Sequence, residues 1–369
     1  MAGSRIVRTS IVGALVALAV IGPAATALAC GGLVAPNGTV NLLRTTTLAA
    51  YHRGVEHYVT SFQFAGKDAG EVGSIVPLPG VPTKVVKAGG WTLQRLVLET
   101  QPPVATLAAE DGRVAASPAQ VLLETQVDAL DITVLKGGAV AVGTWATEHG
   151  FLLPPDAPEV LDFYARRSPI FLAARFNAER AQEQGVQTGE GTPIQITIPT
   201  PNPWVPLRIL SLGRQPNELV QADVFLLTDV PPATLPQTIE SNGDPGQRGL
   251  IQEVSEPASA SLMQDLRSDE RMGWLPSRGM WLTSINVNEE ARRLTHDLAI
   301  DASGFGRPSP VAAGLAFPVI GDGASFPWVP WAAVGLIATV IAAVVATRAG
   351  RSAGRRRGRV GPGWDGRAA

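Results

Sequence analysis

Alternating apolar and polar residues mark most of the strands that the sequence predicts. The runs 45–51 and 55–64 alternate with a period of two and flank Arg53-Gly54, a dipeptide suited to a tight turn, so we expect a β-hairpin. Further strands are predicted at residues 71–76, 120–135 with a bend near 128–131, 170–177, 194–198, 207–212, 222–228, 280–287 and 297–300.

Spacings of three and four between apolar residues predict several helices. In the run 156–166, Val160, Leu161 and Tyr164 share one helical face, and Asp156 with Glu159 resembles a capping box. Helices are also predicted at residues 91–100, 138–149 and 259–267, and a short exposed segment is expected after residue 177. Strands and helices do not alternate regularly, so the predicted fold class is α+β, a β-rich body with several short helices.

Proline interrupts this pattern at residues 76–82. Pro77, Pro79 and Pro82 have no N–H to donate, and each fixes its own φ. We expect a stiff, extended connector that leaves the strand at Val76 and sets the position of the helix near Trp91.

The N-terminus has the pattern of an export signal. Arg5 and Arg8 precede the uncharged apolar run 11–21, and Ala27-Leu28-Ala29 gives the small-x-small pattern after which a signal peptidase cuts. The apolar run is too short to cross a bilayer core of about 30 Å as a helix. Residues 1–29 are therefore predicted to be a cleaved signal peptide.

Cleavage after Ala29 would make Cys30 the first residue of the mature protein. Cys30 is either lipidated, a free N-terminal thiol, or a thiol that pairs with another chain. A lipoprotein signal usually has Leu three residues before the cysteine, where this chain has Ala27. Because Cys30 is the only cysteine, the chain can form neither an internal disulfide framework nor a cysteine-based zinc site.

The C-terminus has the pattern of a single membrane span. The 19 residues 329–347 carry no charge, are bordered by Trp328 and Trp331, and as a helix would extend about 28 Å. Six arginines follow between Arg348 and Arg359 and place the tail in the cytoplasm by the positive-inside rule. We therefore expect a transmembrane helix at 329–347, a basic cytoplasmic tail at 348–369, and contact with membrane lipid through residues 329–359.

These ends divide the chain into an exported body at residues 30–303 and a Gly-, Pro- and Ala-rich stalk at 304–328. The apolar run 311–320 within the stalk is alternatively a last strand packed on the body. The part between signal and span carries 21 basic and 31 acidic residues. An acidic body with no basic patch argues against nucleic acid as a partner.

Candidate chemistry is sparse. The sequence has no nucleophile elbow, zinc-protease motif, P-loop or dinucleotide fingerprint, and we predict no cofactor and no metal. His52 and His57 are five residues apart, which places them on opposite faces of a continuous strand unless the turn between them changes this. With Glu56 they are candidates for a surface metal site, although exposed strand histidines are the simpler interpretation.

The other two histidines have local explanations. His149 falls at a predicted helix C-terminus, where a positive charge suits the helix dipole. His296-Asp297 is either a general-base pair, in which the carboxylate orients the imidazole, or a simple pair at a strand edge. The carboxylate pairs Asp269-Glu270 and Glu289-Glu290 are expected at the surface. The tryptophans line a ligand cleft or belong to the core: Trp91, Trp145, Trp204, Trp274 and Trp281.

Five short motifs occur in one order along residues 29–300: Ala29-Cys30-Gly31-Gly32, Val76 to Pro82, Trp145 with Gly150-Phe151, Pro206 to Ile209, and Trp281-Leu282-Thr283 with Thr295 to Leu298. In this order they resemble the exported bacterial family called domain of unknown function 2330. The resemblance implies an exported, often membrane-anchored protein and no established activity. The chain departs from the family pattern because it lacks a second cysteine before Thr39 and has Ser74 where members often have tryptophan.

Two classes of function remain from the sequence. The first is a cell-envelope binding or scaffolding module with an envelope protein or polymer as partner. The second is a membrane-tethered hydrolase that acts on envelope material. Whether the protein is an enzyme stays open, and the missing motifs and scarce histidines favour the binding module.

Overall fold

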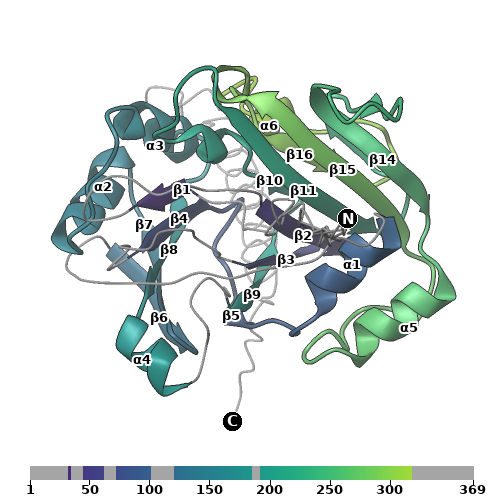
Figure 1. Cartoon of the computed structure of the whole chain (residues 1–369), viewed down its shortest axis with the longest axis horizontal. Helices are drawn as coiled ribbons and strands as arrows, with labels where there is room; N and C mark the ends of the chain where they lie inside the picture. The colour runs from purple at the N-terminus through teal and green to yellow at the C-terminus, as the bar shows by residue number, and fades with distance from the viewer. Residues whose placement is uncertain (1–31, 35–44, 62–71, 101–119, 185–191, 318–369) are drawn as a thin grey trace, which may run out of the picture. The chain divides into compact units, whose positions relative to one another are not determined.

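The computed structural model describes residues 32–34, 45–61, 72–100, 120–184 and 192–317 (Figure 1). All of them belong to one compact unit, Met1–Pro318. The predicted signal peptide, Cys30, the predicted span 329–347 and the basic tail lie outside these residues. Among the described helices, none is long and apolar enough to cross a membrane.

Eight strands form the larger sheet, in the order β13-β14-β15-β11-β2-β3-β9-β5. Their bounds are β2 Thr45–His52, β3 Val55–Ser61, β5 Lys84–Lys87, β9 Pro193–Pro199, β11 Leu219–Thr228, β13 Ile239–Glu240, β14 Gly249–Pro257 and β15 Trp281–Glu290. The predicted hairpin is confirmed: β2 and β3 pair antiparallel across Arg53 and Gly54, which both have positive φ, as a tight hairpin turn requires.

Five strands form a second sheet, in the order β1-β4-β8-β7-β6. They are β1 Gly32–Val34, β4 Gly73–Pro77, β6 Gln120–Val127, β7 Leu130–Lys136 and β8 Ile170–Phe176. The bend expected near residues 128–131 is a complete hairpin turn, with Asp128 at a φ of 47°. A small third sheet has the order β10-β16-β12, from Trp204–Val205, Leu298–Asp301 and Ala233–Leu235. The observed body is thus a β-rich α+β fold.

The proline-rich connector joins the two large sheets. Its first proline, Pro77, still belongs to β4 and pairs with Phe171, so the strand ends one residue later than predicted. At its other end the Thr83 amide donates to the Thr197 carbonyl at 2.8 Å, next to β5. The connector therefore leads into β5 before the helix near Trp91 begins.

Six α-helices and two short 3-10 helices complete the described chain. They are α1 Thr92–Thr100, α2 Ala139–Glu148, α3 Ala157–Ala165, α4 Ala178–Glu183, η1 Arg208–Ser211, α5 Ala260–Ser268, η2 Ala291–Arg293 and α6 Pro310–Ala313. Helices α1, α2, α3 and α5 confirm the sequence pattern. After residue 177 a short exposed segment was expected, and the structure has helix α4 there. The strand expected at 207–212 is wrong, because residues 208–211 form the 3-10 helix η1.

The stalk boundary also needs correction. Residues 310–313 of the segment predicted to be a stalk form α6, and Ala312 and Ala313 are buried in the core of the body. The Asp297 amide donates to the Ala313 carbonyl at 3.0 Å. The body therefore continues past residue 303, and the alternative of a last strand at 311–320 is wrong over the residues described.

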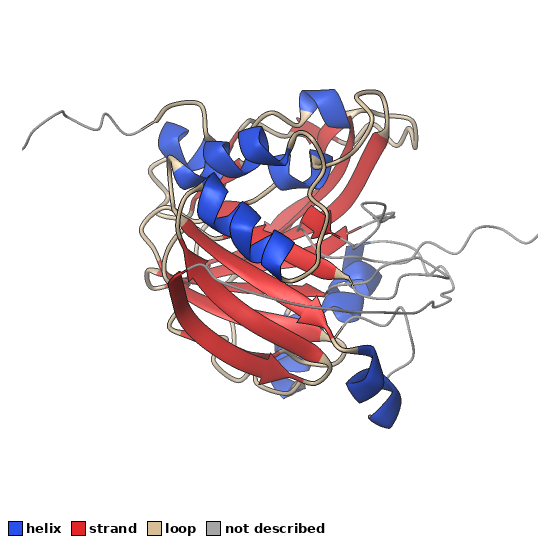
Figure 2. Cartoon of the chain, turned by 90° about the vertical axis from the view of Figure 1, so that its left-hand side faces the viewer, coloured by secondary structure: helices blue, strands red, loops and turns tan. Residues whose placement is uncertain are grey.

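Two hydrophobic cores lie on opposite faces of the eight-stranded sheet. Alternate residues of β2 divide between them: Ala49 belongs to the larger core, whereas Leu48 and Ala50 belong to the smaller one. The larger core also holds α2 and α3, which pack on the five-stranded sheet (Figures 1 and 2). The smaller core is closed by α1 and α5, through residues such as Leu96 and Leu266.

A buried carboxylate holds α1 in place. Asp269, expected at the surface, is 6% exposed and accepts from the amides of Gly90 and Trp91 and from the Thr92 hydroxyl, at 2.7–3.1 Å. It therefore satisfies the free amides at the helix N-terminus from a distant part of the sequence. Glu270 conforms to expectation and pairs with Arg271 at the surface.

Gly89→Ala should disrupt this cap, because an added Cβ would lie 2.1 Å from Asp269 Oδ2. We expect the free energy of unfolding to fall by about 1–2 kcal/mol, the usual cost of losing an N-terminal cap. Urea denaturation of the purified protein measures it. Gly90→Ala is the matched control, since a Cβ there meets nothing within 4 Å. Equal destabilisation by both variants would contradict the role of Asp269.

Candidate functional site

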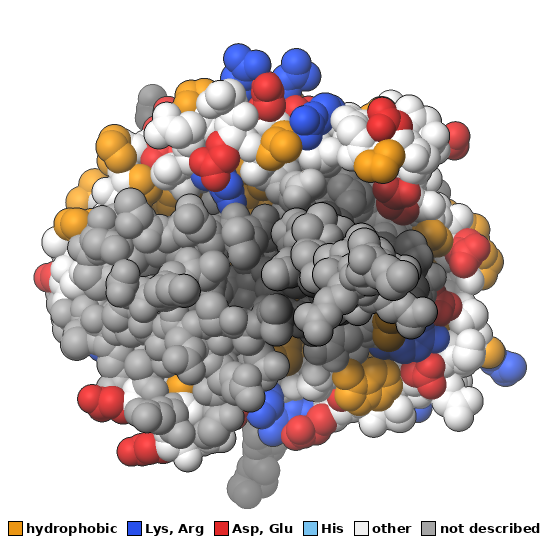
Figure 3. Space-filling model, viewed as in Figure 1, with side chains coloured by type: hydrophobic (Ala, Val, Ile, Leu, Met, Phe, Trp, Pro, Cys, Tyr) orange, Lys and Arg blue, Asp and Glu red, His pale blue; other side chains and the backbone are white. Residues whose placement is uncertain are grey.

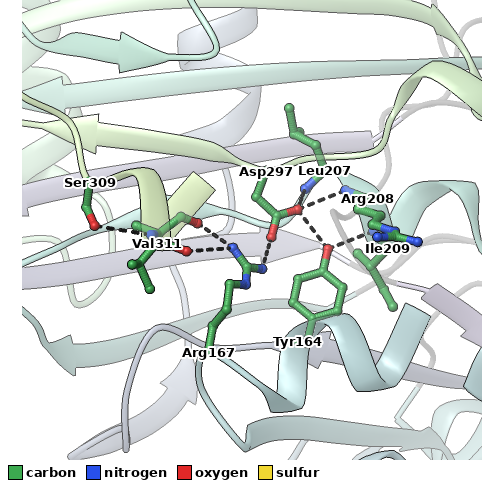
Figure 4. A network of polar contacts seen from close by, with 9 residues as sticks. Tyr164, Arg167, Leu207, Arg208, Ile209, Asp297, Ser309 and Val311 are labelled. Carbon is green, nitrogen blue, oxygen red and sulfur yellow. Dashed lines mark hydrogen bonds and ion pairs between the residues drawn. The ribbon is translucent and has the colours of Figure 1, made fainter. Parts of the chain in front are cut away.

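Asp297 is the centre of a buried polar network (Figure 4). Its side chain is fully buried and accepts hydrogen bonds from the Tyr164 hydroxyl at 2.8 Å, the Leu207 amide at 2.8 Å and the Arg208 amide at 2.9 Å. Its other oxygen pairs with the guanidinium of Arg167, which is 2% exposed. The carboxylate thus has the donors that a buried charge requires.

Arg167 extends the network to the last helix. Its guanidinium donates to the carbonyls of Val311 and Ala312 in α6, and it lies 4.6 Å from the ring centre of Trp204. The Tyr164 hydroxyl in turn accepts from the Ile209 amide at 2.8 Å. Burial and the charge of Asp297 raise the pKa of Tyr164, so its hydroxyl stays protonated and continues to donate.

The general-base pair, one of the two alternatives for His296-Asp297, does not form among the described residues. All the hydrogen bonds of the Asp297 carboxylate go to the groups just named, and His296 Nδ1 instead lies 2.9 Å from the Thr295 hydroxyl. The Asp297 carboxylate therefore connects α3, η1 and α6 and does not orient an imidazole. Its role in the described structure is to hold these elements together.

The other two candidate histidines come together on one face of the sheet. In the β2–β3 register His52 lies opposite Val55 and His57 lies opposite Ala50. Directly opposed residues of an antiparallel pair point to the same side, so the turn brings both imidazoles to the face of the smaller core, as diagonal neighbours. Glu56 points to the opposite face, which excludes the metal site of His52, His57 and Glu56.

His57 is held by two neighbours, Trp274 and Gln195, which also contact each other. Its ring stacks on Trp274 with 3.6 Å between ring centres and 8° between ring planes. Its Nδ1 lies 3.2 Å from Gln195 Nε2, and Trp274 Nε1 donates to Gln195 Oε1 at 3.4 Å. Burial, and to a smaller extent the charge of His52, lowers the pKa of His57 to about 4. The imidazole is therefore neutral at neutral pH.

His52 is held by a carboxylate. Its Nδ1 lies 2.6 Å from Asp229 Oδ1, at the end of β11. Because an ionised carboxylate only accepts, Nδ1–H is the donor of this hydrogen bond. The side chains of His52 and Asp229 are 21% and 38% exposed, so this end of the sheet face is open to solvent. We call His52, His57, Gln195, Asp229 and Trp274 the histidine cluster.

On the other face of β3, Glu56 is fully buried. The backbone of Trp204 lies close enough to lower its pKa slightly, but neither carboxylate oxygen completes a hydrogen bond within the described structure. Burial therefore dominates and raises the pKa of Glu56 to about 8. Glu56 is a neutral acid inside the larger core at neutral pH.

The remaining sequence candidates have structural roles. His149 stacks on Trp145 and its Nδ1 lies 2.8 Å from the Trp145 carbonyl; burial lowers its pKa, so the positive charge suggested by its helix-end position is disfavoured. Trp145 and Trp204 belong to the larger core, whereas Trp274 packs against the smaller one. The tryptophans therefore do not line one cleft.

Two members of the histidine cluster, Gln195 and Asp229, were not candidates from the sequence, and Trp274 was a candidate only as one of five tryptophans. Gln195, Asp229 and Trp274 come from β9, the end of β11 and the segment after α5. Only the strand register brings them to the hairpin. The one available signal was the Arg53-Gly54 turn, since a two-residue turn fixes which residues of the hairpin face each other.

Comparisons with known proteins identify a family and no activity. The model of the family described as "Uncharacterized protein conserved in bacteria (DUF2330)" matches residues 23–230. No curated protein matches the chain. Baculovirus P35 is similar at 10% identity and a TM-score of 0.38, over 71% of this chain and 97% of that one. P35 in its complex with caspase-8 is similar at 8% identity and 0.31, over 70% and 90%. Such scores assign neither fold nor function.

Asp297→Asn should strongly destabilise the body, because it leaves Arg167 as an uncompensated buried charge. We expect a loss of about 3–5 kcal/mol in the free energy of unfolding, measured by urea denaturation. Should this variant not fold, Tyr164→Phe removes a single hydroxyl from the same network and should cost about 1–3 kcal/mol. Glu159→Gln is the control, because Glu159 pairs with Arg208 at the surface and should cost under about 1 kcal/mol. Losses below 1 kcal/mol for both network variants would contradict the network's role.

Glu56 should make stability depend on pH. Its pKa in the folded chain is about 8, against 4.5 for the ordinary group, so the unfolded chain ionises first as pH rises. The stability that Glu56 contributes is complete below pH 4.5 and is lost as pH rises to 8, by up to roughly 1.4 kcal/mol per pH unit. Denaturation between pH 5 and 8 should show this slope in the wild type and a shallower one in Glu56→Gln. Identical slopes would show that Glu56 ionises normally.

Proposed function

The chain belongs to the bacterial family DUF2330, and from that premise we propose that it is a single-pass membrane-anchored extracytoplasmic protein whose body binds or scaffolds components of the cell envelope. The family match begins at residue 23, inside the predicted signal peptide, and covers more than half of the chain.

The anchor is supported by the uncharged run 329–347 and the arginines that follow it. Phe317 is the last residue the structure describes, so eleven residues separate it from the run. Eleven residues reach at most about 40 Å when extended. An anchored body would therefore be confined to the neighbourhood of the membrane, where envelope components are its available partners.

The observation that carries the binding role is the histidine cluster. Neither imidazole Nε2 has a partner among the described residues, whereas each Nδ1 is held by another side chain. Polar groups that are already fixed in orientation are suited to recognition, because their ordering cost is already met in the free protein. Around the described rim of the face shown in Figure 3, acidic and basic side chains are interspersed.

The second candidate is a membrane-tethered hydrolase, and the His52–Asp229 pair favours it. An imidazole oriented by a carboxylate is the arrangement of a general base, which could activate water. Against it, the pKa of His57 near 4 prevents that imidazole from acting as an acid at neutral pH. Incubation with purified envelope material separates the two: a hydrolase releases soluble fragments and loses that activity in Asp229→Asn, whereas a binding module releases none.

The topology is tested by protease treatment of intact spheroplasts that express the full chain with a tag after Ala369. We expect the body to be degraded and the tag to be protected, because the arginine-rich tail should lie in the cytoplasm. Permeabilised spheroplasts are the control, in which both are degraded. A body that resists protease in intact spheroplasts would contradict the proposed function.

A further inference from the structure

We propose that the histidine cluster binds an uncharged polyhydroxylated ligand, a carbohydrate, with His52 accepting a hydrogen bond from one hydroxyl and His57 donating a hydrogen bond to another. The inference rests on the proposed binding function and specifies its ligand. It follows from the protonation that the neighbours impose on each imidazole, and from the position of the two rings on one sheet face.

The donor at His57 is fixed by a chain of hydrogen bonds. Trp274 Nε1 is always a donor, so the Gln195 atom 3.4 Å away is the amide oxygen. The other end of that amide is then its NH₂ group, which donates to His57 Nδ1 at 3.2 Å. A neutral imidazole that accepts at Nδ1 carries its proton at Nε2. His57 therefore presents an N–H donor.

The acceptor at His52 is fixed by Asp229. The Nδ1–H donates to the carboxylate, so Nε2 is the ring nitrogen left to accept a hydrogen bond from a ligand. His52 and His57 are diagonal neighbours on the hairpin, a separation of about 7–8 Å between backbone positions and within reach of long side chains. One donor and one acceptor are thus presented side by side.

This combination selects among ligand classes. A metal ion needs a lone pair from every ligand, whereas Nε2 of His57 carries a hydrogen and has no free lone pair. An anionic ligand needs donors throughout and would be repelled by Asp229 beside His52. A hydroxyl both donates and accepts, and two hydroxyls on one sugar satisfy both imidazoles at once.

The same row of the sheet continues toward its edge. His57 lies opposite Thr197 of β9, and Thr197 lies opposite Lys84 of β5. These three positions share one face, so hydrogen-bonding side chains line it from the hairpin to the edge strand. A row of this kind fits a chain of sugars better than a single one, which agrees with an envelope polymer as partner.

The test uses the full-length protein in a detergent without a sugar headgroup, applied to an array of neutral and acidic oligosaccharides. We expect binding to at least one neutral oligosaccharide. His57→Phe keeps a ring against Trp274 and removes the donor, so affinity should fall at least tenfold. His52→Phe should do the same by removing the acceptor. Melting curves of both variants establish that they are folded.

His149→Phe is the matched control, because His149 also stacks on a tryptophan, Trp145, in the other core. It should leave binding within twofold of the wild type. Binding to no neutral oligosaccharide, binding to acidic ones alone, or equal binding by wild type and His57→Phe would overturn the inference. Retention of the wild type on protein components of isolated envelopes, with no oligosaccharide bound, would overturn it while leaving the proposed function standing.

Discussion

The buried carboxylate of Asp297 is the constraint that orders the last part of the body. A charge without solvent contact is stable only when donors surround it, and here they come from Tyr164, Arg167 and the two amides at the start of η1. Each donor fixes the element that carries it. Tyr164 fixes α3, and the amides of Leu207 and Arg208 fix the start of η1. Arg167 then binds the carbonyls of α6. One side chain therefore determines how three separate segments meet.

Strand β3 shows how one register produces two environments. Glu56 points into the larger core, where burial keeps it protonated, and His57 points to the smaller core beside Trp274. Both pKa values are shifted chiefly by desolvation, in opposite senses, because burial disfavours the charged form of each group. The hairpin turn that sets this register also brings His52 next to His57. Its geometry thus decides both the position of the buried acid and that of the histidine cluster.

Local patterns in the sequence predicted the elements whose signals are local. The hairpin at Arg53-Gly54 and helix α3 follow from residue spacing and turn chemistry within a few positions. The capping box expected at the start of α3 does not form, because the Asp156 carboxylate accepts instead from the Gly213 amide. The strand expected at 207–212 is wrong for a similar reason. The amides of Leu207 and Arg208 donate to Asp297, so they are not available to pair with a neighbouring strand. Contacts between residues far apart in the sequence leave no periodic signal, and they also create the histidine cluster.

The central claim is that neighbours hold His57 as a neutral imidazole with its proton on Nε2. Long-range ¹H–¹⁵N NMR of the full-length protein with ¹⁵N-labelled histidine, recorded between pH 5 and 8, measures the protonation of each ring nitrogen directly. His57 can be assigned by comparison with His57→Phe. The account predicts one protonated nitrogen, Nε2, throughout this range, because the pKa lies near 4. A proton on Nδ1, or titration of the ring above pH 6, would contradict it.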